Sequence, residues 1–273
     1  MPATALGLAL AAACVHAFWN LLLARERDTE SATAVALVAA VVVFAPVTAL
    51  TWRVDSRVWP FIAVTSVLQL VYFALLATAY RRSELSVVYP LARGLAPVIV
   101  LVVGAVVLSA ATSAVQVVGV CLVAVGVLVV RGLRRPTGLS GVGFGIAIAA
   151  TIAAYTLLDK HGIRYAAPIS YLELSMIPAT IGYAGTVLVV RGRSRVRSAI
   201  GTASIAAGVA SFGAYALVLA ALERASAASV AAVRETSIVI ATALAAPLLK
   251  ERVGRARLAG AVLVAAGVAL LAG

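Results

Sequence analysis

The sequence of 273 residues has very few charged side chains. Only 12% of its residues are Asp, Glu, Lys or Arg, about half of the roughly 25% that soluble globular domains carry. Hydrophobic residues make up 63%, and the mean hydropathy is +1.10. This balance excludes a water-soluble domain and indicates a chain that lies in a membrane.

Residues that carry catalysis or bind metals are also scarce. The chain has two histidines and two cysteines, and the HExxH, GxSxG, Walker and CxxC patterns are all missing. Cys14 and Cys121 fall in apolar stretches, where we expect them to pack as small apolar residues without a disulfide. We therefore expect no enzyme, no metal and no cofactor. With no ATP-binding motif, any transport would be driven by a gradient of protons, another ion or the substrate.

Apolar stretches long enough to cross a membrane follow one another along nearly the whole chain. A span needs about 20 mainly apolar residues to cross about 30 Å of hydrocarbon. We expect the first stretch to be a span and not a cleaved signal peptide, because no basic segment precedes it. The sequence predicts an all-α multi-pass protein of the cytoplasmic (inner) membrane, with ten spans at 3–23, 32–52, 59–80, 84–107, 114–130, 141–158, 168–190, 200–222, 226–249 and 255–272.

The net charge of +12 comes from basic residues at the ends of these spans. Such clusters, of which RGRSRVR at 191–197 is one, are a topology signal and give no indication of nucleic-acid binding. The odd-numbered loops contain 15 Lys and Arg, and the termini with the even-numbered loops contain 5. By the positive-inside rule the odd loops are cytoplasmic and both termini are outside.

The two halves of the chain repeat each other. When positions 116–129 are aligned with positions 257–270, six of fourteen residues match. The two segments are 141 residues apart, and the same distance separates Arg93 from Arg234. We call this shift of 141 residues the repeat offset. Because each half has five spans, an odd number, the second half must enter the membrane in the opposite orientation. The sequence thus predicts two inverted five-helix repeats.

The two arginines lie near the middle of their spans. Arg93 is about nine residues, roughly 14 Å, into the fourth span, and Arg234 lies at matching depth in the ninth. Ionisable groups inside a membrane are costly and are functional candidates by default. Since a guanidinium binds carboxylate, phosphate or phosphonate groups through two parallel hydrogen bonds, both arginines favour an anionic or zwitterionic substrate.

Other side chains share helix faces with these arginines or would line a cavity beside them. Ser86 and Tyr89 recur at three- to four-residue spacing before Arg93, and Ser237 follows Arg234 by three. The candidate substrate-binding residues are Arg93, Arg234, Tyr89, Tyr72, Tyr215, Trp19, Asn20, Ser86 and Ser237, and the candidate coupling residues are His16, Glu235 and Glu173.

The arginines also have a purely structural interpretation. Glu235 adjoins Arg234 and would neutralise it as an ion pair. Arg93 would instead cap backbone carbonyls freed by the two prolines of its span. Both interpretations stay open beside the functional one.

The other candidates have structural alternatives too. Glu173 lies only five or six residues into its span and would reach the headgroups. His16 and Asn20, four residues apart on one helix face, suit either a proton acceptor beside a polar partner or interhelical hydrogen bonds. Aromatic belts and ordinary packing also account for tyrosines and tryptophans. Residues 159–161, Asp-Lys-His, lie at a span end and are expected to form an interfacial cluster.

Several segments together resemble a known transporter family. HAFWNLLLARE in the first span, YPLARGLAPV in the fourth and the closing LLKERVGRARLAGAVLVAAGVAL are similar to EamA-type (DUF6) members of the drug/metabolite transporter superfamily. The resemblance covers essentially the whole chain, as EamA-like repeats at 1–131 and 139–273. Its most specific piece is Glu251 with the glycines that follow. The first half departs from the pattern, because Ala110 stands where the matching Glu would be.

The resemblance implies two halves around a central cavity, lined mainly by the third, fourth, eighth and ninth spans with help from the first and sixth. It implies a secondary active transporter, an exporter rather than an importer, that works by alternating access. The first span lacks the acidic residue by which small multidrug exporters hold cations, which again favours anionic or zwitterionic metabolites. The resemblance also implies cytoplasmic termini, against the charge count.

Two other functions stay open at this point. A passive channel or lipid-handling membrane protein would give flux that does not saturate with substrate. A membrane enzyme would need a cavity that gathers His16 or His161 with an acid and a serine. The expected partners are a small-molecule substrate, membrane lipid and coupled protons or another ion, with no nucleic acid, and the chain is expected to act as a monomer or homodimer.

Overall fold

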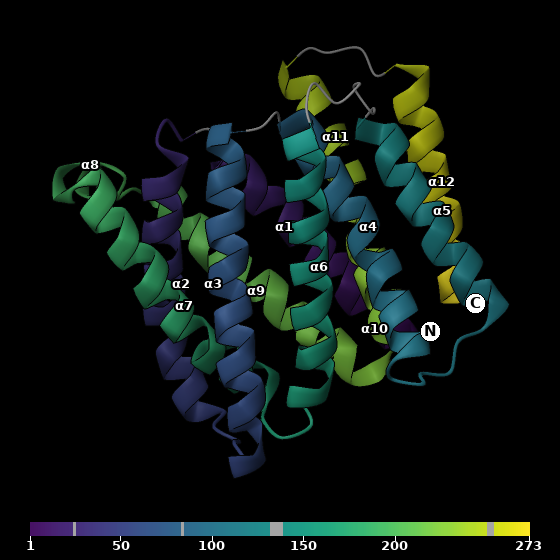
Figure 1. Ribbon diagram of the computed structural model, residues 1–273, viewed down its shortest axis with the longest axis horizontal. Coiled ribbons are helices and arrows are strands. Elements are labelled where there is room, and N and C mark those ends of the chain that lie inside the picture. Colours follow the sequence, from purple (N-terminus) through teal and green to yellow (C-terminus); the bar gives the residue numbers. More distant parts are fainter. Residues whose placement is uncertain (24–25, 83–84, 132–138, 250–253) are drawn as a thin grey trace.

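The chain folds into a bundle of long helices (Figure 1). The computed structural model describes residues 1–23, 26–82, 85–131, 139–249 and 254–273. Over these ranges the first half contains α1 (Ala3–Leu23), α2 (Thr29–Leu50), η1 (Ser56–Val58), α3 (Trp59–Arg82), α4 (Leu85–Val106) and α5 (Ala114–Arg131). The second half contains α6 (Leu139–Gly162), α7 (Pro168–Arg191), α8 (Arg193–Ser198), α9 (Thr202–Arg224), α10 (Ala227–Arg234), α11 (Thr236–Leu249) and α12 (Arg255–Ala272).

The helices agree closely with the predicted spans. Within the described ranges, nine helical segments are long and apolar enough to cross a membrane, and Ala114–Val130 is a shorter apolar helix. The main difference is the ninth span, which was expected to be continuous and is divided at Glu235 into α10 and α11. There the Glu235 N–H donates to the Ala232 carbonyl and the Ile238 N–H to the Glu235 carbonyl, each at 3.0 Å. These i to i−3 bonds tighten the backbone at the interruption and leave neither of these amides unpaired.

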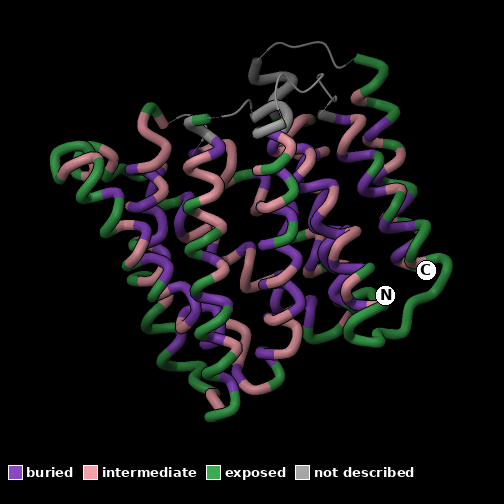
Figure 2. The backbone as a smooth tube through the Cα atoms, in the orientation of Figure 1, coloured by how far each residue is buried: buried purple, intermediate pink, exposed green. Residues whose placement is uncertain are grey.

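The helices that carry the two arginines lie at the centre of the bundle. Of the span windows in α4 and in α10–α11, 56% and 67% of residues are buried, compared with 22–28% in α1, α2, α3 and α12. Figure 2 shows exposed residues concentrated at the ends of the bundle and on its outer helices. The arginines are therefore placed where lipid does not reach.

Glycines allow α5 and α12 to pack at very short range. A Cβ atom on Gly126 would lie 2.7 Å from the Gly260 carbonyl oxygen, and one on Gly267 would lie 2.6 Å from the Gly119 carbonyl oxygen. Real Cβ atoms essentially never approach so closely. The spacing of small residues predicted from the sequence thus has a packing function, as at other close helix crossings in membranes.

Helices that the repeat offset relates make matching contacts. The offset relates α1 to α6, α3 to α9, and α4 to α10 with α11. Accordingly, α1 packs on α9 and α6 packs on α3. In the same way, α4 packs on α6, and α10 and α11 pack on α1. α2 packs on its own equivalent α7, and α5 on its equivalent α12. The N-terminal ammonium donates to the Leu271 carbonyl at 2.7 Å, so the two ends of the chain lie together (Figure 1).

Candidate functional site

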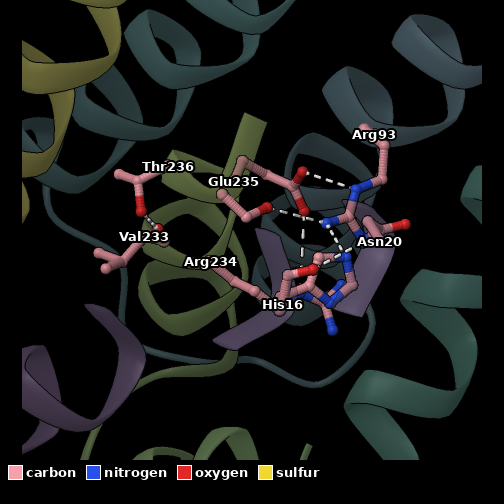
Figure 3. Close-up of polar contacts among 8 residues, drawn as sticks. His16, Asn20, Arg93, Val233, Arg234, Glu235 and Thr236 are labelled. Carbon is pink, nitrogen blue, oxygen red and sulfur yellow. Dashed lines mark hydrogen bonds and ion pairs between the residues drawn. The ribbon is translucent and has the colours of Figure 1, made fainter. Parts of the chain in front are cut away.

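Two buried guanidinium groups and one carboxylate meet between the halves of the chain (Figure 3). Nε of Arg93 on α4 lies 2.9 Å from Oε2 of Glu235. Nε of Arg234, at the end of α10, lies 3.8 Å from the other oxygen, Oε1. The side chain of Arg93 is only 7% exposed, that of Arg234 4% and that of Glu235 1%. The helix break at Glu235 allows neighbouring residues to contribute both the shared carboxylate and one guanidinium.

The two guanidinium groups are unequally satisfied. Besides its ion pair, Arg93 Nη2 donates to Ser237 Oγ at 3.3 Å and contacts His16 Nε2 at 3.0 Å. Because a guanidinium only donates, His16 Nε2 must accept, and the imidazole is neutral with its proton on Nδ1. By contrast, Nε and Nη2 of Arg234 are both buried without a hydrogen-bond partner among the described residues, whereas in Arg93 this holds only for Nε, which is ion-paired. Arg234 therefore has unused donors inside the protein.

Aromatic and amide side chains surround this cluster. The Arg93 guanidinium carbon lies 5.9 Å from the centre of the Tyr89 ring, a cation–π distance. Trp19 packs edge-on against His16, with ring centres 4.9 Å apart, and its indole N–H has no partner in the described part of the chain. Asn20 Nδ2 donates to the His16 carbonyl at 2.8 Å, within the same helix. The first span thus contributes one direct contact, through His16.

Two of the remaining predicted site residues are tyrosines beside this cluster, where Tyr72 interacts electrostatically with Arg93 and Tyr215 with Arg234. Tyr72 and Tyr215 each pack edge-on against Tyr155, with ring centres 6.3 and 6.0 Å from its own. Glu173 on α7 is buried and, over the described ranges, neither carboxylate oxygen has a hydrogen-bond partner. Ser86 belongs to α4, but its side chain lies outside those that the structure describes.

Asp159 was expected in an interfacial cluster, and this expectation was wrong. Its side chain is 0% exposed. Oδ1 accepts hydrogen bonds from Thr65 Oγ1 at 2.9 Å and Tyr171 Oη at 2.8 Å, and Oδ2 accepts one from Tyr215 Oη at 2.5 Å. Its neighbour Lys160 points elsewhere and donates to the Leu222 and Ala225 carbonyls at the end of α9. We define Asp159, Thr65, Tyr171 and Tyr215 as the Asp159 cage.

Sequence reasoning missed this cage because its donors come from helices far apart in the chain. Thr65 and Tyr215 lie in different halves, and no local pattern brings them together. A partial signal was present, since Asp159 and Tyr155, whose ring packs against Tyr215 of the cage, are four residues apart and share a helix face. Gly162 is a second signal, because a Cβ atom there would overlap the Tyr171 ring.

An apolar cavity of about 590 Å³ lies apart from these polar clusters. It is bounded by α1, α2, α7 and α9, with small residues of α9 on one wall. Its lining, as far as the described residues define it, includes no predicted site residue. The lining residues are Val15, Phe44, Thr51, Ala167, Pro168, Ile169, Val209, Ala210, Gly213, Ala216, Leu217 and Ala220.

Comparisons with known proteins agree with the fold. No curated protein matches the chain. A crystal structure titled only as that of a protein matches with a TM-score of 0.78 and 14% identity, and the match covers 99% of this chain and 96% of that one. The model of the EamA-like transporter family matches twice, at residues 3–132 and 139–273. The chain therefore belongs to the EamA-like transporter family, a family of multi-span membrane transporters.

Proposed function

We propose that the protein is a secondary active transporter of small anionic or zwitterionic metabolites, and that the substrate binds at Arg234. The proposal depends on one observation above all. Two buried guanidinium groups share a single carboxylate, and Nε and Nη2 of one of them, Arg234, have no hydrogen-bond partner in the described ranges.

The charge of this cluster favours an anion. With His16 neutral, Arg93, Arg234 and Glu235 together have a formal charge of +1 in the buried interior. A buried charge that no contacting group balances is unfavourable, and buried donors without partners add to the cost. A carboxylate, phosphate or phosphonate group would neutralise the excess charge and accept hydrogen bonds from Nε and Nη2 of Arg234 at once.

Alternating access is the mechanism we propose, with two inverted repeats that rock against each other. The matching contacts of helices related by the repeat offset support this arrangement. The glycines of α5 and α12 support it too. The offset relates Gly119 to Gly260 and Gly126 to Gly267, and the two close contacts, Gly119 with Gly267 and Gly126 with Gly260, are therefore equivalent. Such a set of contacts is what a two-fold axis in the membrane plane would produce.

The divided ninth span supports a binding site at its break. Transporters of this construction bind substrates near the membrane midplane where a helix is interrupted. α11 begins at the residue after Glu235, and the N-terminal end of a helix has a partial positive charge. We propose the cytoplasmic membrane as the location and export as the direction, with the substrate gradient or a coupled ion as the driving force.

A transport assay with a matched variant tests the proposal. Purified protein is reconstituted in liposomes, and counterflow of radiolabelled methylphosphonate is compared with that of methylammonium. We expect saturable counterflow of the anion alone. Arg234→Gln should abolish it, because the unused donors are lost, while Arg53→Gln, which changes an exposed arginine, should not.

Three results would contradict the proposal. Equal counterflow of methylphosphonate in the Arg234→Gln protein would remove Arg234 from the site. Flux that never saturates would indicate a passive channel. Preferential movement of methylammonium would reverse the assigned charge of the substrate.

A further inference from the structure

The Asp159 cage can hold its central group in two charge states. When Asp159 is ionised, Thr65 and Tyr171 both donate to Oδ1 and Tyr215 donates to Oδ2. Thr65 Oγ1 and Tyr171 Oη also lie 2.9 Å from each other, and either hydroxyl can donate to the other. If Oδ1 carries a proton, it can donate to Thr65, Thr65 to Tyr171, and Tyr171 back to Oδ1. Every hydroxyl then still donates once.

The same distances do not suit a metal cation. The hydroxyl oxygens lie 2.5–2.9 Å from the carboxylate oxygens, which are direct hydrogen-bond lengths. A cation between these atoms would have to separate them. The cage therefore consists of direct hydrogen bonds to the carboxylate.

The other half of the chain has no equivalent of this cage. Under the repeat offset, the positions equivalent to Asp159, Tyr171, Tyr215 and Thr65 are occupied by Phe18, Glu30, Ala74 and Ala206. None of these residues could rebuild the cage in the other half, although helices related by that offset pack in the same way. A buried carboxylate that occurs in only one of the two halves needs a reason other than helix packing.

Charge connects the cage to the proposed substrate site. Asp159 interacts electrostatically with Arg234, and Tyr155, which packs against Tyr215, interacts with both of them. While the site is empty, ionised Asp159 offsets the formal charge of +1 on the arginine cluster. An anion at Arg234 would make the two clusters together negative by one charge, and one proton on Asp159 would restore neutrality.

We propose that Asp159 binds one proton when an anion binds at Arg234, so that proton and anion cross the membrane together. This inference rests on the function proposed above. Since the pair is electrically neutral, its movement depends on the combined concentration gradients of anion and proton and not on the membrane potential, so an anion that has accumulated sufficiently inside leaves with a proton.

Other titratable groups lie on the elements around this region, and their titration must be separated from that of Asp159 in any pH experiment. They lie on several elements that pack around the cage or beside it. They are Arg93 on α4, Tyr72 on α3, Tyr155, Lys160 and His161 on α6, Tyr171 and Glu173 on α7, Tyr215 and Glu223 on α9, Arg234 and Glu235 at the helix break, and His16 on α1.

Proton movement measured together with anion movement tests the proposal. Liposomes that contain the protein are loaded with methanesulfonate, which stays ionised at every pH used, and with a pH-sensitive dye. In the wild type we expect the lumen to become alkaline as methanesulfonate leaves, with about one proton per anion. Asp159→Asn should lower this ratio to near zero and make any remaining flux sensitive to membrane potential.

A second variant covers the case in which Asp159→Asn does not fold. Tyr215→Phe removes one donor to the ionised carboxylate and so favours its protonated form. The pH at which proton-coupled flux falls to half should shift upward. An unchanged profile, or an unchanged proton-to-anion ratio in Asp159→Asn, would make Asp159 a structural group and overturn the inference.

Results with the wild type separate this inference from the proposed function. Methanesulfonate flux without proton movement would overturn the inference and leave anion transport standing. Flux that requires Na⁺ in place of protons would also overturn it. The absence of both methanesulfonate and methylphosphonate flux would instead overturn the proposed function, and this inference with it.

Discussion

Oε2 of Glu235 lies 2.9 Å from Nε of Arg93, although the two residues belong to different halves of the chain. The contact joins α4 to the break between α10 and α11. It also leaves the second guanidinium, Arg234, with a more distant share of the same carboxylate. One acidic group thus bridges the two halves of the chain and balances one of the two buried positive charges.

Removing the shared carboxylate should destabilise the protein strongly. Glu235→Gln leaves two buried guanidinium groups without the carboxylate that contacts them, and breaking a buried pair in this way costs about 3–5 kcal/mol. We expect a lower midpoint of thermal unfolding in detergent, partly restored by methylphosphonate. Glu223→Gln, which removes a surface partner of Arg224, is the control and should cost about 0–1 kcal/mol. Equal losses in the two variants would contradict the account.

Replacing Arg234 by lysine should weaken anion binding without removing the charge. Lysine cannot present two parallel donors to one anionic group. The loss of one charge-assisted hydrogen bond, about 1.5–3 kcal/mol, predicts a Michaelis constant for methylphosphonate at least about ten times higher. Saturation kinetics of counterflow measure this change. Wild-type kinetics in Arg234→Lys would show that only charge matters at this position.

The crossing of α5 and α12 should not tolerate a methyl group. Gly126→Ala places its Cβ 2.7 Å from the Gly260 carbonyl oxygen, and overpacking of this kind costs about 1–3 kcal/mol. Gly143→Ala is the matched control, because no described atom lies within 4 Å of the added Cβ. Thermal unfolding should separate the two variants. If Gly126→Ala is as stable as Gly143→Ala, the helices do not approach as described.

Equivalent positions in the two repeats should face opposite sides of the membrane. Ser113 precedes α5, and Gly254, its equivalent under the repeat offset, precedes α12. In a protein with Cys14 and Cys121 replaced by alanine, we expect Ser113→Cys to react with an impermeant maleimide from outside intact cells. Gly254→Cys should react only after the cells are opened.

The labelling result also decides between the two expected orientations. Labelling of Gly254→Cys from outside and Ser113→Cys from inside would place the termini in the cytoplasm and contradict the charge count. Labelling of both from the same side would contradict the inverted repeat.

Most of the fold could be predicted because a membrane leaves a sequence few choices. Every span must be long, apolar and helical, since hydrocarbon offers no partner for backbone groups. The sequence match between the halves also identified Arg234 as the equivalent of Arg93 before the structure was known. The break at Glu235 was not predicted, because no proline or glycine marks it. It is visible only in the two i to i−3 hydrogen bonds.

The candidate site was only partly predictable. Depth in a span identified Arg93 and Arg234, and the contacts of Arg93 with His16 and Ser237 join residues that the sequence had proposed separately. That Glu235 would be shared by both arginines depends on the packing of α4 against α10, which periodicity does not determine. Asp159 was misplaced for the same reason, since position near a span end does not reveal what covers a side chain.

Ligand-dependent stability of the purified protein tests the central claim most directly. A ligand at 100 times its dissociation constant adds about 2.7 kcal/mol to the free energy of unfolding. The account predicts that methylphosphonate raises the unfolding midpoint of the wild type, that methylammonium does not, and that a folded Arg234→Gln protein responds to neither. Equal stabilisation of the wild type and Arg234→Gln by methylphosphonate would show that the anion binds elsewhere.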